Sequence, residues 1–188
     1  IVAIGASFSD VTIGDDDDNT KEVLATIGAN SQIGQIDAVG AVTVHADSTI
    51  NAESETFAVA GGIGAFNFNF AFVDVQPNVE ASIGGGANIK ATGLITVEAW
   101  TLHDATGDVF ALTVGLAAGG TSFATVNVVP TVAALIGGNS TIQAGGIVML
   151  SSHNYDGETA TDRGANAFAE ASGGGLLSLR SCAAISGR

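Results

Sequence analysis

The stretch Val79-Glu80-Ala81-Ser82-Ile83-Gly84 recurs as Val132-Ala133-Ala134-Leu135-Ile136-Gly137, and the offset from Val79 to Val132 is 53 residues. The same offset joins further identical residues, which are Phe57 and Phe110, Gly62 and Gly115, Phe70 and Phe123, Val73 and Val126, and Pro77 and Pro130. Self-similarity at a long fixed period is typical of a repeat architecture, in which each unit buries its apolar face against its neighbours. We therefore expect residues one repeat apart, such as Val73 and Val126 or Ile83 and Ile136, to stack.

The repeat divides the whole chain into a single array, predicted as a partial repeat 1–26 followed by repeats 27–79, 80–132 and 133–188. The first copy is longer than the later ones at two places, by six residues within 13–23 and by three within 28–37. Insertions at fixed phases of a repeat are expected in loops at the edge of the stack. Residues 176–185 are predicted to follow the strand pattern of residues 122–131.

Apolar residues alternate with period two along most segments, which favours β-strands over helices. We expect about five short strands in each repeat, at residues 79–83, 88–91, 94–100, 108–118 and 121–129, separated by glycine-rich joints. The predicted fold is all-β, a repeat β-solenoid (β-helix) with a 53-residue repeat and two or three coils per repeat. A Greek-key sandwich assembled from repeats is the competing architecture.

Composition limits the classes of partner. The chain has 188 residues, 46% of them hydrophobic, and its formal charge of −14 would repel phosphate backbones and anionic lipid head groups. We therefore expect no nucleic-acid partner. No apolar run reaches the roughly 18 to 20 residues of a membrane helix, so no membrane span is expected. The single cysteine, Cys182, rules out an internal disulfide framework.

The acidic run Asp15-Asp16-Asp17-Asp18 is the densest group of metal-ligand residues in the chain. Calcium binds six to eight oxygens, and adjacent carboxylates on a loop can supply several of them. The run lacks the alternating spacing of an EF-hand loop. It is interpreted either as a calcium site or as a solvated surface loop whose charges repel one another.

Four aromatic residues, Phe66, Phe68, Phe70 and Phe72, alternate with smaller ones and so share one face of a predicted strand. The repeat aligns Ala71 and Val73 with Ala124 and Val126, which favours an interior position for the Ala/Val side. The phenylalanines would then form an outer interaction face, with Phe8, Phe70 and Phe123 in a column, covered by a partner. The alternative is that a turn near Gly64 reverses the parity and buries the rings.

Sequence motifs for catalysis are weak. The three histidines, His45, His103 and His153, occupy unrelated phases of the repeat, and no serine, cysteine or carboxylate is placed near one of them by a known motif. A polysaccharide lyase would need basic residues, whereas the five lysines and arginines are scattered. We therefore expect that the protein is not an enzyme. A cleft with two carboxylates and a basic residue would favour the opposite conclusion.

The unit Val132-Ala133-Ala134-Leu135-Ile136-Gly137, followed by Ser140-Thr141-Ile142-Gln143-Ala144-Gly145-Gly146-Ile147-Val148, resembles the Ala/Gly/Val-rich repeats of large bacterial surface proteins. These are the filamentous-haemagglutinin-like and leukotoxin-like adhesins. The resemblance implies a secreted, cell-surface β-solenoid with a structural or adhesive role, and it transfers no catalytic or ligand residue.

The expected function is that of an extracellular structural and adhesive β-solenoid segment, part of a fibre (filament) or of a very long surface protein. The alternative is a carbohydrate-active β-helix enzyme, a polysaccharide lyase or hydrolase. Expected partners are further copies or further repeats joined end to end, and a surface receptor or glycan. The only cofactor considered is Ca2+ at the aspartate run.

Overall fold

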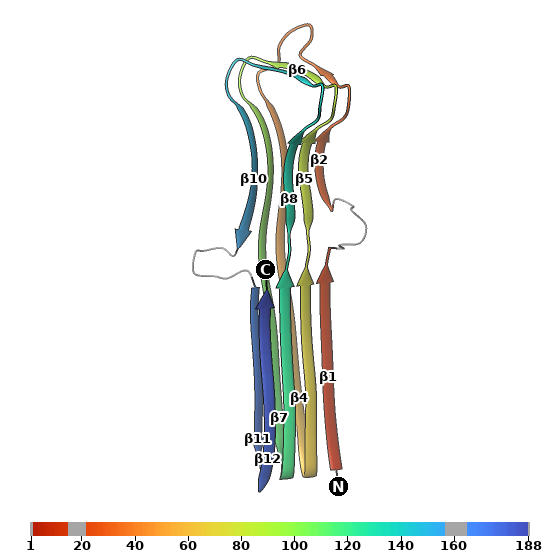
Figure 1. Cartoon of the computed structure of the whole chain (residues 1–188), viewed down its shortest axis with the longest axis vertical. Coiled ribbons are helices and arrows are strands. Elements are labelled where there is room, and N and C mark those ends of the chain that lie inside the picture. Colours follow the sequence, from red (N-terminus) through yellow and green to blue (C-terminus); the bar gives the residue numbers. More distant parts are fainter. Residues whose placement is uncertain (1, 15–21, 157–164, 188) are drawn as a thin grey trace.

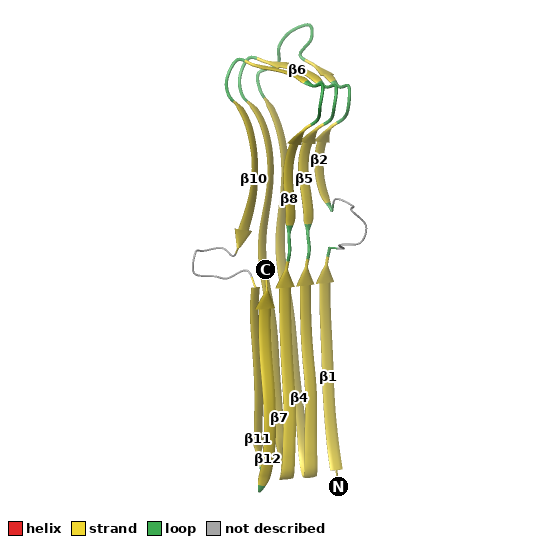
Figure 2. Cartoon of the chain, viewed as in Figure 1, coloured by secondary structure: helices red, strands yellow, loops and turns green. Residues whose placement is uncertain are grey.

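The computed structural model describes residues 2–14, 22–156 and 165–187, and the described residues form strands and loops without a helix (Figure 2). The strands are β1 (Val2–Ile13), β2 (Val23–Ile27), β3 (Gln32–Ile33), β4 (Val42–Val75), β5 (Asn78–Ile83), β6 (Asn88–Ala91), β7 (Ile95–Val128), β8 (Thr131–Ile136), β9 (Thr141–Ala144), β10 (Val148–Asp156), β11 (Ala165–Gly174) and β12 (Leu177–Gly187). Every pairing between them is parallel. Greek keys are antiparallel, so the sandwich alternative does not fit the described strands.

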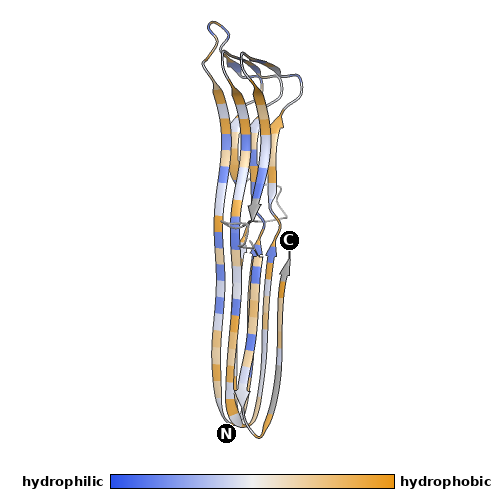
Figure 3. Ribbon diagram, turned by 90° about the vertical axis from the view of Figure 1, so that its left-hand side faces the viewer, coloured by the Kyte–Doolittle hydropathy of each residue, from blue (hydrophilic) through white to orange (hydrophobic). Residues whose placement is uncertain are grey.

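Each pass of the chain follows one long, narrow path. The strands β4 and β7 descend almost the length of the molecule, fold back at the end where the N-terminus lies, and rise again (Figures 1 and 3). The amide Nδ2 of Asn67 in the rising segment of β4 donates to the carbonyl oxygen of Ala58 in the descending segment, at 3.1 Å. From there β5 and β8 continue upward, and β6 and β9 cross the upper end. The all-β, parallel arrangement is compatible with a β-solenoid.

The hydrogen-bonded neighbours of the central strands lie one sequence repeat apart. In β4 and β7, Phe57 pairs with Phe110 and Val73 with Val126. Ile83 of β5 pairs with Ile136 of β8, so both predicted stacking pairs are confirmed. Direct pairing at this offset means that a single repeat completes one pass, and the prediction of two or three coils per repeat is wrong. The error came from assuming coils of ordinary length, whereas β4 and β7 have 34 residues each.

The register of the first pass places the two predicted insertions. From Val42 on, register partners are separated by the repeat length of 53 residues, as with Val42 and Ile95. The offset from Val23 to its partner Val79 is three residues longer than the repeat, and the offset from Val2 to its partner Gly64 is nine residues longer. Six residues are therefore accommodated between β1 and β2, and three between β3 and β4. Both lie in connections between strands, as predicted.

The last pass departs from the predicted register. Ala165 pairs with Ala105 and Ile185 with Thr125, so β11 and β12 are shifted by seven positions relative to the repeat. Residues 176–185 therefore do not stack on residues 122–131 at the expected phase. Seven extra residues between β10 and β11 cause the shift. Because seven is odd, Ala165, Ala167 and Ala169 lie on the inner side, opposite Ala105, Gly107 and Val109, whereas the repeat offset would align them with outward positions of β7.

The prediction that glycine-rich joints separate the strands is wrong for β7. The separate strands predicted at 94–100, 108–118 and 121–129 are one strand, β7, which continues through Gly119 and Gly120. The fold-back lies instead at Gly62 and at its register partner Gly115. A Cβ on Gly115 would collide with the carbonyl oxygen of Gly62, and one on Gly175 with that of Gly115. Glycine is needed here because successive backbones approach closely at the bend.

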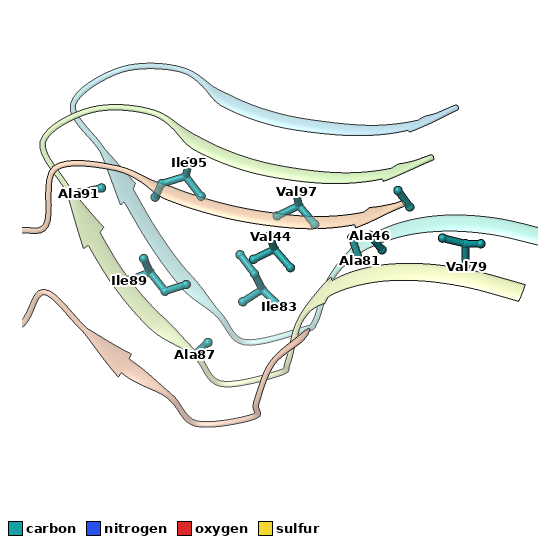
Figure 4. Packing of buried hydrophobic residues seen from close by; sticks show 11 residues of the cluster. Val44, Ala46, Val79, Ala81, Ile83, Ala87, Ile89, Ala91, Ile95 and Val97 are labelled. Carbon is teal, nitrogen blue, oxygen red and sulfur yellow. The ribbon is translucent and has the colours of Figure 1, made fainter. Parts of the chain in front are cut away.

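The apolar core runs through the stack as columns of small residues. At the upper end, strands on three sides enclose buried aliphatic residues including Ile83, Ile89, Ile95 and Val97 (Figure 4). In the lower half of the molecule, the descending and rising layers face each other. There Ala52 and Ala105 of the descending segments pack with Val73 and Val126 of the rising segments. Small side chains suit this thin space between the layers.

Candidate functional site

The rising segments of β1, β4, β7 and β12 form a four-stranded sheet whose outer surface is the most distinctive region of the molecule. We define the aromatic face as the outward side chains of this sheet up to the row of Asp10 and Phe72. Its described members with large apolar side chains are Val2, Ile4, Phe8, Phe66, Phe68, Phe70, Phe72, Phe123, Leu177 and Ile185. Phe8, Phe70 and Phe123 lie in register, so the predicted column is confirmed.

The phenylalanines of β4 point outward. Phe66 is 40% exposed and Phe68 is 44% exposed, whereas the alternating Asn67 and Asn69 are fully buried. Phe72 contacts its neighbours, with ring centroids 5.6 Å from Phe8 and 6.0 Å from Phe123. The outer orientation follows the repeat alignment. The buried positions of β4 change from even-numbered residues such as Ala60 to odd-numbered residues from Ala65 on, and this reversal leaves the rings outside instead of burying them. Sequence reasoning therefore placed these rings correctly, although no finding tests what they bind.

Buried asparagines on the inner side hold the sheet in position. Asn67 Nδ2 donates to the carbonyl oxygens of Ala58 and Leu112, at 3.1 and 2.8 Å. Asn69 Nδ2 donates to the carbonyl oxygen of Phe110 at 3.0 Å, and Ser7 Oγ donates to Asn69 Oδ1 at 3.0 Å. The Nδ2 bonds join the rising layer to the descending layer. They explain why asparagine can occupy an interior position, since each Nδ2 has a partner across the core.

Two shallow hollows flank the ridge of rings. The lower one, of about 380 Å³, is lined by Phe66, Asn67, Phe68, Gly119, Gly120, Thr121 and Ser181. The upper one, of about 560 Å³, is lined by Asp10, Thr12, Phe72, Val73, Asp74, Thr125, Val126, Asn127 and Ile185. Both cross the strands, because each takes residues from several successive passes.

The upper hollow was not found from the sequence. Asp74 is the centre of its polar side, and its carboxylate accepts from Gln76 Nε2 at 2.9 Å and from Asn127 Nδ2 at 3.1 Å. The contact between Asp74 and Asn127 could have been predicted, because these two polar residues are one repeat apart in the sequence. The hollow contains two carboxylates, Asp10 and Asp74, but its described lining has no basic residue. It thus has only some of the groups expected of a carbohydrate-active enzyme.

The outer surface of the lower descending segments differs in charge from the aromatic face. We call this surface the acidic face, and its outward carboxylates are Glu53, Glu55, Asp104, Asp108 and Glu170. Glu55 and Asp108 are register partners. Phe57 and Phe110 continue the same surface downward and stack at 5.3 Å with nearly parallel rings. The acidic face therefore combines carboxylates with exposed apolar side chains, which include Val59, Val114 and Phe168.

The histidines are not grouped into a catalytic site in the described residues. His153 pairs in register with Trp100, and its ring centroid lies 5.7 Å from the indole. His45 packs on the other side of Trp100 at 5.1 Å, with its Nδ1 3.6 Å from Glu98 Oε2. His103 is buried on the inner side of β7. Trp100 and His153 are one repeat apart, so this column could have been predicted from the sequence.

The calcium prediction concerns residues without a structural description. Asp15, Asp16, Asp17 and Asp18 lie outside the described ranges, so their arrangement stays a prediction. Within the described ranges, no group of three or more His, Cys, Asp or Glu residues is placed to hold a metal ion.

Comparisons of the chain with protein-family models, with curated proteins and with solved structures find no match. Among the residues that the structure describes, no helix has the length and apolarity needed to cross a membrane. The fold and the site therefore define an all-β protein of stacked parallel strands with an aromatic outer face.

Proposed function

We propose that the chain is an extracellular β-solenoid segment with a structural and adhesive role, part of a fibre or of a very long surface protein. One observation carries the proposal: like residues occupy hydrogen-bonded register positions on successive passes, as with Val44 and Val97 or Phe57 and Phe110. Each pass therefore presents nearly the same surface to the next pass. Stacked units of this kind stabilise one another mainly through contacts with their nearest neighbours.

The outermost strands support continuation of the stack. Among the described strands, β1, β2 and β3 pair on one side only, and so do β8, β9 and β10 on the opposite side of the stack. An unpaired strand edge offers a row of N–H and C=O groups to any strand of matching pattern. Further passes, from the same polypeptide or from another copy, would extend the existing ladders.

The sequence resemblance supports an extracellular location. The Ala/Gly/Val-rich unit at 132–148 is similar to the repeats of large bacterial adhesins, and the formal charge of −14 favours solubility. The direction of growth follows from the fold. Neighbouring passes are separated by about 4.8 Å, so the array grows across the strands. Its width is the long axis of the folded pass, which is the vertical axis of Figure 1.

Mass per length tests this proposal. One pass weighs about 5 kDa, from 18.5 kDa for 188 residues, and adds about 4.8 Å to the array. Scanning transmission electron microscopy of the assembled protein should therefore give about 1 kDa per Å along the fibre. A value near one half or one third of this would indicate two or three coils per repeat. A protein that occurs natively as a free monomer and never assembles would contradict the proposed function.

A further inference from the structure

In the upper hollow, polar and apolar side chains from successive passes converge. The hollow takes residues from the rising segments of β1, β4, β7 and β12. One register row across these strands combines a carboxylate, an aromatic ring, a hydroxyl and an aliphatic side chain, from Asp10, Phe72, Thr125 and Ile185. The row two residues further along the strands is polar, with Thr12, Asp74 and Asn127. The volume of about 560 Å³ lies within the range of roughly 300 to 1,000 Å³ that is usual for small-ligand sites.

The polar row is held in position by its own hydrogen bonds. Gln76 Nε2 donates to both carboxylate oxygens of Asp74 at 2.9 Å. Asn127 Nδ2 donates to Asp74 Oδ1 at 3.1 Å. A carboxylate has about four acceptor positions, so these bonds leave Asp74 able to accept a further donor from a ligand. Thr12 adds a hydroxyl on one side of Asp74, and Asn127 adds an amide on the other. Together these groups can donate to and accept from the hydroxyls of a sugar.

Phe72 supplies an apolar surface beside the polar row. The centroid of its ring lies 5.6 Å from that of Phe8 and 6.0 Å from that of Phe123, so neighbouring rings hold it in place. Ile185 adds an aliphatic side chain that is 52% exposed. A sugar ring has a C–H face as well as a rim of hydroxyls, and C–H groups are attracted to the negative face of an aromatic ring. The combination of a fixed ring and a polar row therefore suits a sugar.

The charge of the hollow selects the kind of sugar. Its described lining contains the carboxylates of Asp10 and Asp74 and no basic residue. These two residues lie on adjacent strands, two positions apart in register and about 8 Å apart along the backbone, so one sugar residue can reach both. Uronates and sulfated sugars would be repelled there, whereas an amino group would be attracted. We propose that the upper hollow binds an amino sugar, which would supply the adhesive contact and so rests on the proposed function.

Other ligands fit the upper hollow less well. A divalent cation requires oxygen ligands, whereas the amide N–H groups of Gln76 and Asn127 already donate to the carboxylate of Asp74. A neutral sugar would gain nothing from the charge of the two carboxylates. The lower hollow offers an amino sugar no ionic partner, because its described polar side chains are one amide and two hydroxyls. The amino sugar is therefore assigned to the upper hollow alone.

Calorimetric titration with short oligomers of glucosamine, glucose and galacturonic acid tests the assignment, in slightly acidic buffer that keeps the amine protonated. We expect the glucosamine oligomer to bind with a Kd of about 1 mM or tighter, and the other two to bind more weakly. Asp10 is exposed, so Asp10→Asn removes charge without removing packed atoms, and it should weaken glucosamine binding by about tenfold. Asp108→Asn is the matched control on the acidic face. It should leave the affinity unchanged in physiological salt, where the Debye length is about 8 Å.

A second variant tests the polar row without changing the charge. Thr12 is exposed and lines the upper hollow, so Thr12→Val should weaken glucosamine binding and leave the circular dichroism spectrum unchanged. A wild type that binds no glucosamine oligomer at millimolar concentration would overturn the assignment. Equal losses in Asp10→Asn and Asp108→Asn would also overturn it, because the oligomer would then respond to net charge and not to the hollow. Mass per length does not depend on sugar binding, so a stacked array that binds no glucosamine would refute the sugar site and leave the fibre intact.

Discussion

At the residue scale, glycine matters most where successive backbones meet. Gly115 is such a position, because a Cβ there would collide with the carbonyl oxygen of Gly62 in the previous pass. The sequence repeat identified Gly62 and Gly115 as equivalent, but it could not show that they form a bend. Glycine has the same appearance in sequence at a bend and within an extended strand such as Gly119-Gly120. The distinction depends on the approach of another backbone.

The variant Gly115→Ala should therefore lower the free energy of unfolding by about 2 kcal/mol or more, because the backbones must move apart to accept the methyl group. Gly61→Ala is the matched control. A Cβ on Gly61 would lie 3.9 Å from the carbonyl oxygen of Val114, which is an ordinary contact. Urea denaturation of both variants measures the difference, and equal stability of the two would refute the role assigned to Gly115.

The aspartate run allows another prediction at this scale. If Asp15 to Asp18 bind calcium, a chelator should lower the melting temperature, because a bound ion stabilises only the folded state. Replacing Asp16 and Asp18 with Asn should remove the response to the chelator. A melting curve that is the same with and without the chelator would leave the run as a solvated surface loop.

At the element scale, the alternation of side chains along β4 was readable from the sequence. The period of two and the alignment of Val73 with Val126 correctly placed the phenylalanines outside. The length of the strand was not readable, because residue patterns do not show whether neighbouring β segments are separated by a turn. The bonds of Asn67 across the core also escaped prediction, since they join residues whose proximity depends on the fold-back.

We predict that Asn67→Ala destabilises the protein by about 2 kcal/mol or more, because it removes two buried hydrogen bonds and leaves the carbonyl groups of Ala58 and Leu112 without this donor. Asn51→Ala is the control, since Asn51 is exposed on the same strand and should tolerate the change within about 0.5 kcal/mol. Thermal unfolding followed by circular dichroism compares the two. Similar melting temperatures would show that the asparagine bonds do not hold the layers together.

At the scale of the whole molecule, the repeat predicted the stacking and its offset but not the shape of a pass. Identical residues at equivalent positions fix which strands are neighbours, and the insertions of six and three residues explain the larger offsets of the first pass. The last pass was misplaced because seven extra residues precede β11, which changes the register of β11 and β12 and the face on which each side chain lies. The number of coils in a repeat could not be derived, since it depends on strand length and not on the period.

The central claim is that one repeat of the sequence forms one pass, stacked directly on the next, and electron paramagnetic resonance tests it most directly. Spin labels at Glu55→Cys and Asp108→Cys, in a Cys182→Ser background, should lie on register partners with backbones about 4.8 Å apart. A control pair at Glu55→Cys and Asp104→Cys is offset by four residues, or about 13 Å along the strand. We predict strong spin–spin broadening for the first pair and weak broadening for the control. Equally weak broadening in both pairs would contradict the account.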